Sequence, residues 1–307
     1  MNYIVLDLEW NQGQKYDKRD VPTFEIIEIG AVKLDEQFRV VDTFQRLIKP
    51  HIYNTMHKIT AELVNLDMRD LKGEDLFTKV AKEFLRWCGE DYIFCIWGVQ
   101  DLTEFQKNMD YYRMEPLSKG PLKYYDIQKL YSLACEDGKA RHSLSHVVEE
   151  ECLLDEEMEF HRALGDAYYT ALIFCKIQNA ELLERVSFDT YRIPENKKEQ
   201  VFWKFDNYTK LISEGYDGKA KLMSDKTITC VRCIYCDKAL RKKIRWYSQN
   251  NGKHYYTVAK CSEHGLMKGK IRVRKSKDDK YYAIKTVKNI SEEEAELIIS
   301  KKKTEAK

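Results

Sequence analysis

Two carboxylates stand two residues apart near the start of the chain, in the stretch Tyr3-Ile4-Val5-Leu6-Asp7-Leu8-Glu9-Trp10. The stretch opens as a continuous apolar run, which is typical of a strand buried on both faces. Successive side chains of a strand point to opposite faces, so Asp7 and Glu9 share one face. Such a pair fits either a polar outer face at the end of the strand or a divalent metal ion bound by oxygen ligands.

Three residues further along extend this chemistry. Asp101 follows an apolar run that ends in Trp97-Gly98, where an ordinary helix N-cap is the alternative. Asp166 comes five residues after His161, on an expected helix over residues 160–178. Its neighbours are small or apolar: Ala163, Leu164, Gly165, Ala167 and Tyr168. An acid in such surroundings is poorly hydrated and needs a partner.

A second set of ligand types lies near the end of the chain. Cys233 and Cys236 form a Cys-x2-Cys pair, and Cys261 and His264 form a Cys-x2-His pair beyond an expected hairpin. This spacing is typical of a zinc ribbon with one structural Zn²⁺ held by these four residues, the alternative being reduced, unligated thiols. Cys230 also stands three residues before Cys233, so Cys230 and Cys233 are an alternative pair. We expect the later pair to bind, because Cys236-Asp237-Lys238 resembles a knuckle turn that enters the next strand.

Basic and aromatic residues alternate around these cysteines, with Arg245 and Trp246 at the centre of the stretch. Cations beside aromatic rings suit a strand of nucleic acid, which offers phosphates and stackable bases. The alternative is that the aromatic rings fill a thin core.

Composition limits the class of protein. The chain has 307 residues, of which 43% are hydrophobic and 33% charged, and nine are cysteines. No apolar run approaches the ~20 residues of a membrane span, and the first residues do not resemble a signal peptide. We therefore expect a cytoplasmic protein with reduced thiols and no membrane partner. Residues 1–194 carry 24 Lys+Arg against 35 Asp+Glu, a net of −11, and residues 195–307 carry 28 against 15, a net of +13. This asymmetry favours an acidic body joined to a basic, polyanion-binding module.

The apolar patterns predict elements that position these residues. Strands over 26–34 and 38–48 follow the first one closely, and further strands over 92–98 and 122–127 alternate with helices, which indicates a mixed α/β sheet. Residues 183–216 look partly helical, because Val201, Phe205 and Tyr208 are spaced as an amphipathic face.

The polar stretch 215–225 is the expected linker. Beyond it we expect strands over 244–247 and 255–258 around an Asn250-Asn251-Gly252 turn, a strand over 281–287, and a helix starting at Ser291. The predicted domains are thus residues 1–180, a helical extension and linker over 181–225, and a small β-rich, zinc-ribbon-like, nucleic-acid-binding module over 226–307.

Four motifs, taken in order, resemble a known family. Asp7-Leu8-Glu9, the run Ile26–Val32, Trp97-Gly98 with Asp101, and the run His161–Ala167 resemble the motifs of the DEDDh 3′–5′ exonucleases. That family includes the proofreading subunit of bacterial DNA polymerase III, ribonuclease T and oligoribonuclease. For residues 1–180 the resemblance implies a ribonuclease H-like fold, a mixed five-stranded sheet with one antiparallel strand, flanked by helices.

The resemblance also implies roles for single residues. Asp7, Glu9 and Asp166 would hold one Mg²⁺ or Mn²⁺, and Asp7 would touch a second such ion supported by Asp101. His161 would be the general base. Residues that would line the terminal nucleotide are Leu8, Met56, His57 and Ile59.

The expected function is a two-metal-ion 3′–5′ exonuclease that acts on a single-stranded 3′ end of DNA or RNA. A variant of this expectation confines the activity to very short oligonucleotides. The alternative from another class is a regulatory nucleic-acid-binding protein that uses the fold as a scaffold. Protein partners cannot be predicted from the sequence.

Overall fold

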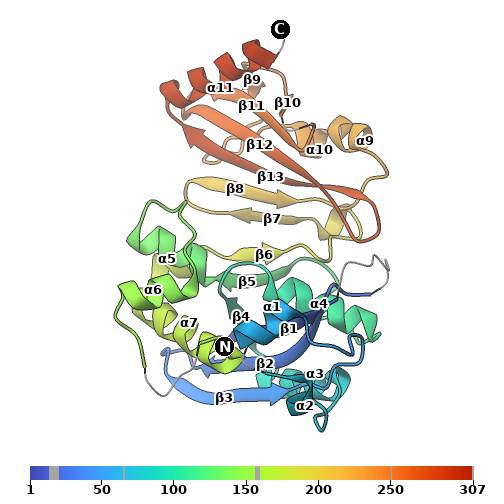
Figure 1. Ribbon diagram of the computed structural model, residues 1–307. Helices are drawn as coiled ribbons and strands as arrows, with labels where there is room; N and C mark the ends of the chain where they lie inside the picture. Colours follow the sequence, from blue (N-terminus) through green and yellow to red (C-terminus); the bar gives the residue numbers. More distant parts are fainter. Residues whose placement is uncertain (14–20, 65, 156–159, 250, 306–307) are drawn as a thin grey trace. The chain divides into compact units, whose positions relative to one another are not determined.

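The computed structural model describes residues 1–13, 21–64, 66–155, 160–249 and 251–305 (Figure 1). The chain divides into two compact units. The N-terminal unit comprises Met1–Leu117 and Leu122–Asp189, and the C-terminal unit comprises Ser118–Pro121 and Thr190–Lys307. Among the described residues, no helix has the length and apolar character needed to span a membrane.

The N-terminal unit is built on a six-stranded mixed sheet in the order β3-β2-β1-β4-β5-β6. The strands are β1 (Asn2–Gln12), β2 (Phe24–Leu34), β3 (Val40–Leu47), β4 (Tyr92–Ile96), β5 (Leu122–Asp126) and β6 (Ser187–Asp189). β1 pairs antiparallel with β2 and parallel with β4, and β4 pairs parallel with β5. The mixed sheet flanked by helices is the predicted fold, and its one difference is the short sixth strand β6, antiparallel to β5.

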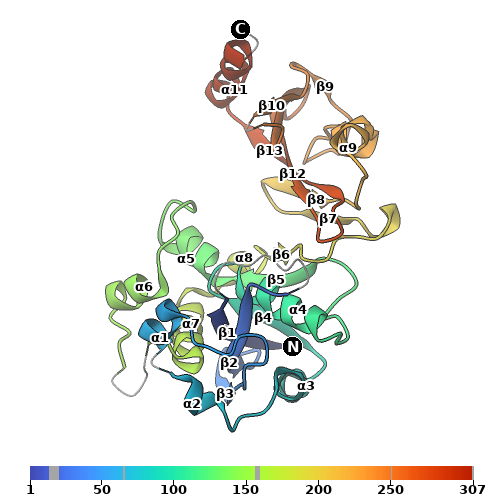
Figure 2. The same ribbon diagram turned by 45° about the vertical axis from the view of Figure 1, so that its right-hand side comes forward.

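Helices cover both faces of this sheet, as the two ribbon views show (Figures 1 and 2). They are α1 (Lys58–Val64), α2 (Met68–Leu71), α3 (Phe77–Cys88), α4 (Asp101–Tyr111), α5 (Ile127–Cys135), α6 (Leu144–Glu150), α7 (Ala163–Ile177) and α8 (Ala180–Leu183). Ile4, Leu6 and Leu8 of β1 pack in one core cluster with residues of α3 and α4. The other face of β1 lies under α7, where Tyr3 makes an edge-on ring contact with Phe174. The alternation expected from the sequence therefore places Asp7 and Glu9 on the α7 face.

The C-terminal unit contains a long antiparallel sheet in the order β10-β11-β12-β13-β8-β7, with β9 paired to β11. Its elements are η1 (Lys197–Glu199), β7 (Val201–Lys204), β8 (Tyr208–Ile212), α9 (Lys219–Ser224), α10 (Lys226–Thr229), β9 (Arg241–Lys242), β10 (Tyr247–Gln249), β11 (His254–Cys261), β12 (Gly265–Lys275), β13 (Tyr281–Ile290) and α11 (Glu292–Glu305). Three separate clusters of buried apolar side chains support it. The unit therefore has more core than the small ribbon that the cysteine spacing suggested.

The structure differs from the sequence-based expectation over residues 183–225. Val201 and Tyr208, expected on one helix face, belong to the antiparallel strands β7 and β8. The reason is long-range pairing, because β8 also pairs with β13, which lies some seventy residues further along the chain. The expected linker 215–225 contains α9, whose Leu222 is fully buried in a core cluster.

The expected hairpin is confirmed, since β10 pairs antiparallel with β11. Asn251 and Gly252 have φ values of 54° and 72°, the left-handed conformation that such a turn requires. Asn250 lies outside the described residues. The helix predicted to begin at Ser291 is α11, where the hydroxyl of Ser291 accepts a hydrogen bond from the N–H of Glu294 at 3.2 Å.

Candidate active site and metal-ligand cluster

The first two carboxylates extend past the end of the neighbouring parallel strand. The pairing of β1 with β4 runs from Asn2 to Val5, so Asp7 and Glu9 lie beyond the carboxyl end of β4. A register shift between Glu9 and Trp10 locally changes the pairing with β2. Such irregularities are common beside functional sites, where they redirect a side chain.

Asp166 reaches the same place because α7 lies unusually close to β2. Gly30 pairs with Asp7 across the sheet, and a Cβ atom on Gly30 would lie 2.0 Å from the backbone of Ala163. Only a glycine allows the first turn of α7 to approach this strand. Asp166 stands in that first turn, so the contact at Gly30 sets its distance from β1.

The structure brings the carboxylates of Asp7, Glu9 and Asp166 together, with one oxygen of each within 4.8 Å of the others. Asp101 is outside this group of three. It is buried at the first position of α4, with its pKa raised to about 7, mainly by burial. Its charge is among the causes that raise the pKa of Asp7, so it belongs to the same electrostatic cluster.

The cluster carries more negative charge than its surroundings compensate. Burial, together with the charges of Asp101 and Asp166, raises the pKa of Asp7 well above its ordinary value. Burial and neighbouring acids raise the pKa of Glu9 to about 8. Burial raises that of Asp166 to about 6, and its Oδ1 atom is buried without a hydrogen-bond partner among the described residues. Hard cations are the natural complement to such a set of oxygens.

The cation next to this cluster is already bound to another residue. Arg162 donates to both carboxylate oxygens of the fully buried Glu28, at 2.9 and 3.1 Å. Gln45 donates to the same carboxylate at 2.7 Å. This network anchors the residue before α7 to β2. The sequence does not predict this ion pair, because nothing local indicates that residues 134 positions apart are paired.

His161 stands just before α7 and is exposed. Its φ of 60° is uncommon for a residue with a side chain, and strained backbone of this kind tends to cluster at functional sites. The charge of His161 counteracts the burial that raises the pKa of Asp166, which places the two side chains in electrostatic reach of each other.

A loop over residues 51–57 is fixed beside β1. The buried Asn11 side chain accepts from the N–H of His57 at 2.8 Å and donates to the carbonyl of Thr55 at 3.0 Å. The Glu25 carboxylate accepts the backbone N–H groups of residues 51–53. Met56 and His57 are thereby held partly exposed, and Ile59 is 53% exposed. Leu8 differs, because its side chain lies in the core and only its backbone is near the acids.

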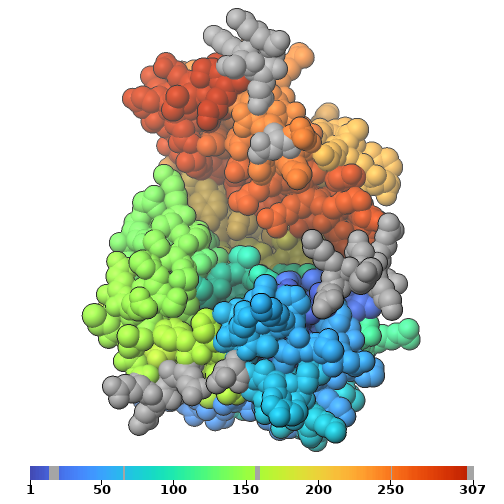
Figure 3. Space-filling model, viewed as in Figure 1, coloured from blue at the N-terminus to red at the C-terminus, as the bar shows by residue number. Residues whose placement is uncertain are grey.

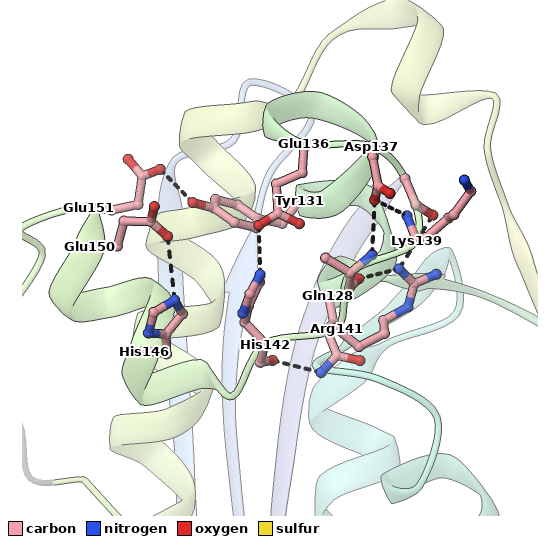
Figure 4. Close-up of polar contacts among 12 residues, drawn as sticks. Gln128, Tyr131, Glu136, Asp137, Lys139, Arg141, His142, His146, Glu150 and Glu151 are labelled. Atoms are coloured by element: carbon pink, nitrogen blue, oxygen red, sulfur yellow. Dashed lines mark hydrogen bonds and ion pairs between the residues drawn. The ribbon is translucent and has the colours of Figure 1, made fainter.

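A second loop, residues 136–143, is held beside Trp97, in the bend that precedes Asp101 and α4. The carbonyl of His142 accepts from the indole N–H of Trp97 and from the amide of Gln128, at 3.2 and 2.8 Å. The His142 ring lies 2.7 Å from the Glu136 carboxylate, and the carboxylate of Asp137 accepts a hydrogen bond from the backbone N–H of Lys139 (Figure 4). In the space-filling view (Figure 3), the green segment with α5 and α6 and the blue segment with α1 are both exposed on one face of the N-terminal unit.

The cysteine and histidine residues predicted as ligands gather in the C-terminal unit. Cys233, Cys236, Cys261 and His264 offer ligand atoms within 4.8 Å of one another, and Cys230 is not part of this group. The Sγ atoms of Cys236 and Cys261 are 3.8 Å apart, and the Nδ1 of His264 is 3.6 Å from the Sγ of Cys233 and of Cys261. A tetrahedral Zn²⁺ with bonds of ~2.3 Å to sulfur and ~2.0–2.1 Å to nitrogen requires separations of ~3.6–3.8 Å.

The two predicted nucleic-acid contacts around the cysteines lie in different surroundings. Arg245 is exposed. Trp246 packs against two core clusters and donates its indole N–H to the carbonyl of Thr229 at 2.9 Å. The position of Trp246 favours the alternative left open by the sequence, in which this aromatic ring fills the core.

Comparison with solved structures finds a 3′-exonuclease in a structure of 3′-end recognition of the histone mRNA stem-loop (19% identity, TM-score 0.48, covering 57% of this chain and 80% of that chain). It also finds the nuclease domain of 3′hExo, a DEDDh family member, bound to rAMP (21% identity, TM-score 0.48, covering 57% and 90%). Exonuclease I of E. coli in complex with a dA16 oligonucleotide has 12% identity and a TM-score of 0.46, covering 84% of this chain and 54% of that chain. A search of curated proteins finds no match.

The family comparison is decisive. Residues 4–174 match the model of the exonuclease family RNase_T. This range contains most of β1, with Asp7 and Glu9, the start of α4 with Asp101, and the first turn of α7 with Asp166. Since the matched residues make up more than half of the 307-residue chain, the chain belongs to the RNase_T exonuclease family.

Proposed function

We propose that this enzyme hydrolyses phosphodiester bonds at the 3′ end of single-stranded DNA or RNA with two Mg²⁺ or Mn²⁺ ions. The observation that carries the proposal is the set of three carboxylates within 4.8 Å of one another. The fit to cations is supported by two observations: the Oδ1 atom of Asp166 is buried with no hydrogen-bond partner in the described part of the chain, and the guanidinium of Arg162 is paired with Glu28.

In this proposal Asp7, Glu9 and Asp166 hold one ion, and Asp7 with the support of Asp101 holds the other. When bound, the ions would stabilise negative charge on the entering and leaving oxygens of the phosphoryl displacement. The chain itself supplies the orientation of the acids, through the strand alternation at Asp7 and Glu9 and the close approach of α7 at Gly30.

His161 acts as the general base in this proposal and accepts the proton of the attacking water at its imidazole. Its exposure and its electrostatic interaction with Asp166 support that role. The loop with Met56, His57 and Ile59 contacts the terminal nucleotide. One structural Zn²⁺, bound by Cys233, Cys236, Cys261 and His264, stabilises the C-terminal unit, as the separations of these ligand atoms support.

The test is degradation of 5′-labelled single- and double-stranded DNA and RNA with Mg²⁺ or Mn²⁺, with the products resolved by length. We expect ladders that shorten from the 3′ end. Asp7→Ala and Asp166→Ala should abolish degradation, because each removes a cation ligand, whereas Asp278→Ala, which removes an exposed aspartate of the C-terminal unit, should retain it. Degradation that continues undiminished in EDTA would contradict the metal dependence. If the enzyme degrades only oligonucleotides a few nucleotides long, its substrates are very short oligonucleotides rather than long strands.

A further inference from the structure

A basic pocket of about 770 Å³ lies within the C-terminal unit. This volume is in the range of about 300–1,000 Å³ that ligand pockets occupy. Its floor is one face of the strands β7, β8 and β13, and its wall is the segment from α10 to the first zinc-ligand cysteines. Neither the active-site acids nor Arg245 and Trp246 line it.

The strand register explains which side chains meet on the floor. Leu211 of β8 pairs with Lys285 of β13 on one side and with Phe202 of β7 on the other. Residues paired across neighbouring strands point to the same face, so these three side chains form one row. The next row along the strands contains Lys204 of β7, paired with Thr209 of β8.

Positive charge dominates the lining. Asp237 is the acidic residue in the lining. The basic residues there are Lys197, Lys204, Lys226, Arg232 and Lys285. Lys197 pairs with Asp225, and Arg232 pairs with Asp237 in a solvent-exposed contact of little strength. Lys204 and Lys226 make no ion pair with a described residue. The pocket therefore has cationic groups in excess.

Lys285 is the most unusual of these cations, because it is only 8% exposed. Its ammonium group donates to the backbone carbonyls of Cys230 and Thr227, and it makes no ion pair with a carboxylate among the described residues. Burial lowers the pKa of Lys285 to about 8. A buried ammonium ion that only carbonyl dipoles compensate is stabilised further by an anion in the same pocket.

Phe202 adds a second kind of contact at the edge of the pocket. It belongs to the edge strand β7 and is 59% exposed, so its ring is accessible to a ligand in the pocket. An exposed aromatic ring between lysines is the arrangement that holds single-stranded nucleic acid, where bases stack on the ring and phosphates lie against the cations.

We propose that this pocket binds a stretch of the single-stranded nucleic acid substrate, with a base stacked on Phe202 and phosphates against Lys204 and Lys226. A polymer suits the pocket better than a free nucleotide, because its several cations match several consecutive phosphates. The inference rests on the proposed function for the identity of the polymer. It goes beyond that function by assigning a substrate-holding site outside the catalytic acids.

The experiment measures binding of a fluorescent single-stranded 20-mer, as DNA and as RNA, by fluorescence anisotropy. It uses the full chain with Asp7→Asn and with zinc but without Mg²⁺ or Mn²⁺, so that binding is measured without cleavage. Phe202→Ala should weaken binding by about 5- to 150-fold, the range for loss of one stacked base. Lys204→Glu should weaken binding and reduce the slope of log Kd against log salt concentration by about 0.7, the value for one phosphate of a single strand.

Two matched variants control for general effects. Lys260→Glu makes the same charge change at an exposed strand lysine outside the pocket, and Leu297→Ala removes an exposed apolar side chain from α11. Both should retain affinity within about twofold, a margin well below one stacked base. Equal losses in Lys204→Glu and Lys260→Glu, or no loss in Phe202→Ala, would overturn the proposal. So would competition by free AMP as effective as that by the 20-mer, which would make the pocket a nucleotide site.

These outcomes separate the pocket from the catalytic proposal. If the wild-type enzyme degrades nucleic acid while Phe202→Ala binds normally, the pocket inference fails and the proposed function stands. If binding depends on Phe202 but the wild-type enzyme degrades none of the DNA or RNA substrates, the pocket inference stands and the proposed function fails.

Discussion

At the scale of single residues, the candidate active site is a cluster of acids with few cations beside it among the described residues. Asp7, Glu9 and Asp166 lie within 4.8 Å of one another, and the nearby guanidinium of Arg162 is paired with Glu28. Like charges this close, in partly buried positions, raise one another's pKa values. The metal-free protein therefore keeps part of this cluster protonated at neutral pH.

This leads to a prediction about stability and pH without metal. Glu9 has a folded-state pKa of about 8, above its ordinary value of 4.5. The folded state thus binds more protons than the unfolded state between these values, so stability is highest below about 4.5 and falls as the pH rises towards 8. Thermal unfolding in EDTA should show a Tm for the N-terminal unit that decreases over this window, and Asp7→Asn should flatten the decrease. Other groups act in the same window, so the informative quantity is the difference between variant and wild type. A Tm difference that does not change with pH would contradict the prediction.

His161 gives the second prediction at this scale. If its imidazole is the base, His161→Ala should lower kcat by about 10²–10⁴-fold with little change in KM. The acidic limb of the pH–rate profile should disappear with it. His146→Ala, at an exposed histidine 3.8 Å from Glu150, is the matched control and should retain both rate and profile (Figure 4). If His161→Ala keeps the acidic limb of the wild-type pH–rate profile, a group other than His161 accepts the proton of the attacking water.

At the scale of elements, the site depends on the close contact between α7 and β2. Gly30→Ala would place a methyl group 2.0 Å from the backbone of Ala163, and neither strand nor helix backbone can move far in a packed core. We expect a loss of about 1–3 kcal/mol or more in stability, together with reduced activity, because the first turn of α7 carries Asp166. Gly73→Ala is the control, since a Cβ atom there meets nothing within 4 Å. Circular dichroism melts and initial rates measure both effects. Equal stability of the two variants would show that the contact is not restrictive.

The elements also show how far sequence reasoning reaches. The apolar run of β1 and the alternation at Asp7 and Glu9 are local patterns, and they predicted both the strand and its acidic face. Neither β7 nor β8 was predicted, because Val201, Phe205 and Tyr208 also fit a helical period and only the pairing of β8 with β13 decides between them. The Glu28–Arg162 pair and the pocket around Lys285 depend in the same way on residues distant in sequence.

At the scale of the whole molecule, the two units have separate cores, and the cysteine cluster belongs to one of them. We predict one Zn²⁺ per chain, since four ligand atoms gather at tetrahedral distances. Cys261→Ser should lose the zinc and lower the unfolding temperature of the C-terminal unit, because Cys261 is also buried in a core cluster. The unfolding transition of the N-terminal unit should remain in place.

Cys230→Ser is the matched control and should retain zinc. Metal analysis by mass spectrometry and differential scanning calorimetry test the two variants together. Zinc retained in Cys261→Ser but lost in Cys230→Ser would reverse the ligand assignment. A single transition that shifts as a whole in Cys261→Ser would show that the two units do not unfold independently.

The pairing of β8 with β13 has a consequence for how the protein is made. The last strand of the N-terminal unit, β6, ends at Asp189, whereas the sheet of the C-terminal unit closes only when β13, ending at Ile290, has been synthesised. At about 5–20 residues per second, the ribosome needs roughly 5–20 s to add the intervening residues. During that time a hairpin of β7 and β8 lacks β13, so the edge of β8 that β13 later covers is unpaired, in addition to the outer edge of β7. A strand edge exposed for seconds is where a nascent chain pairs wrongly, and the lysines at positions 204 and 210 of this hairpin oppose such pairing by charge repulsion.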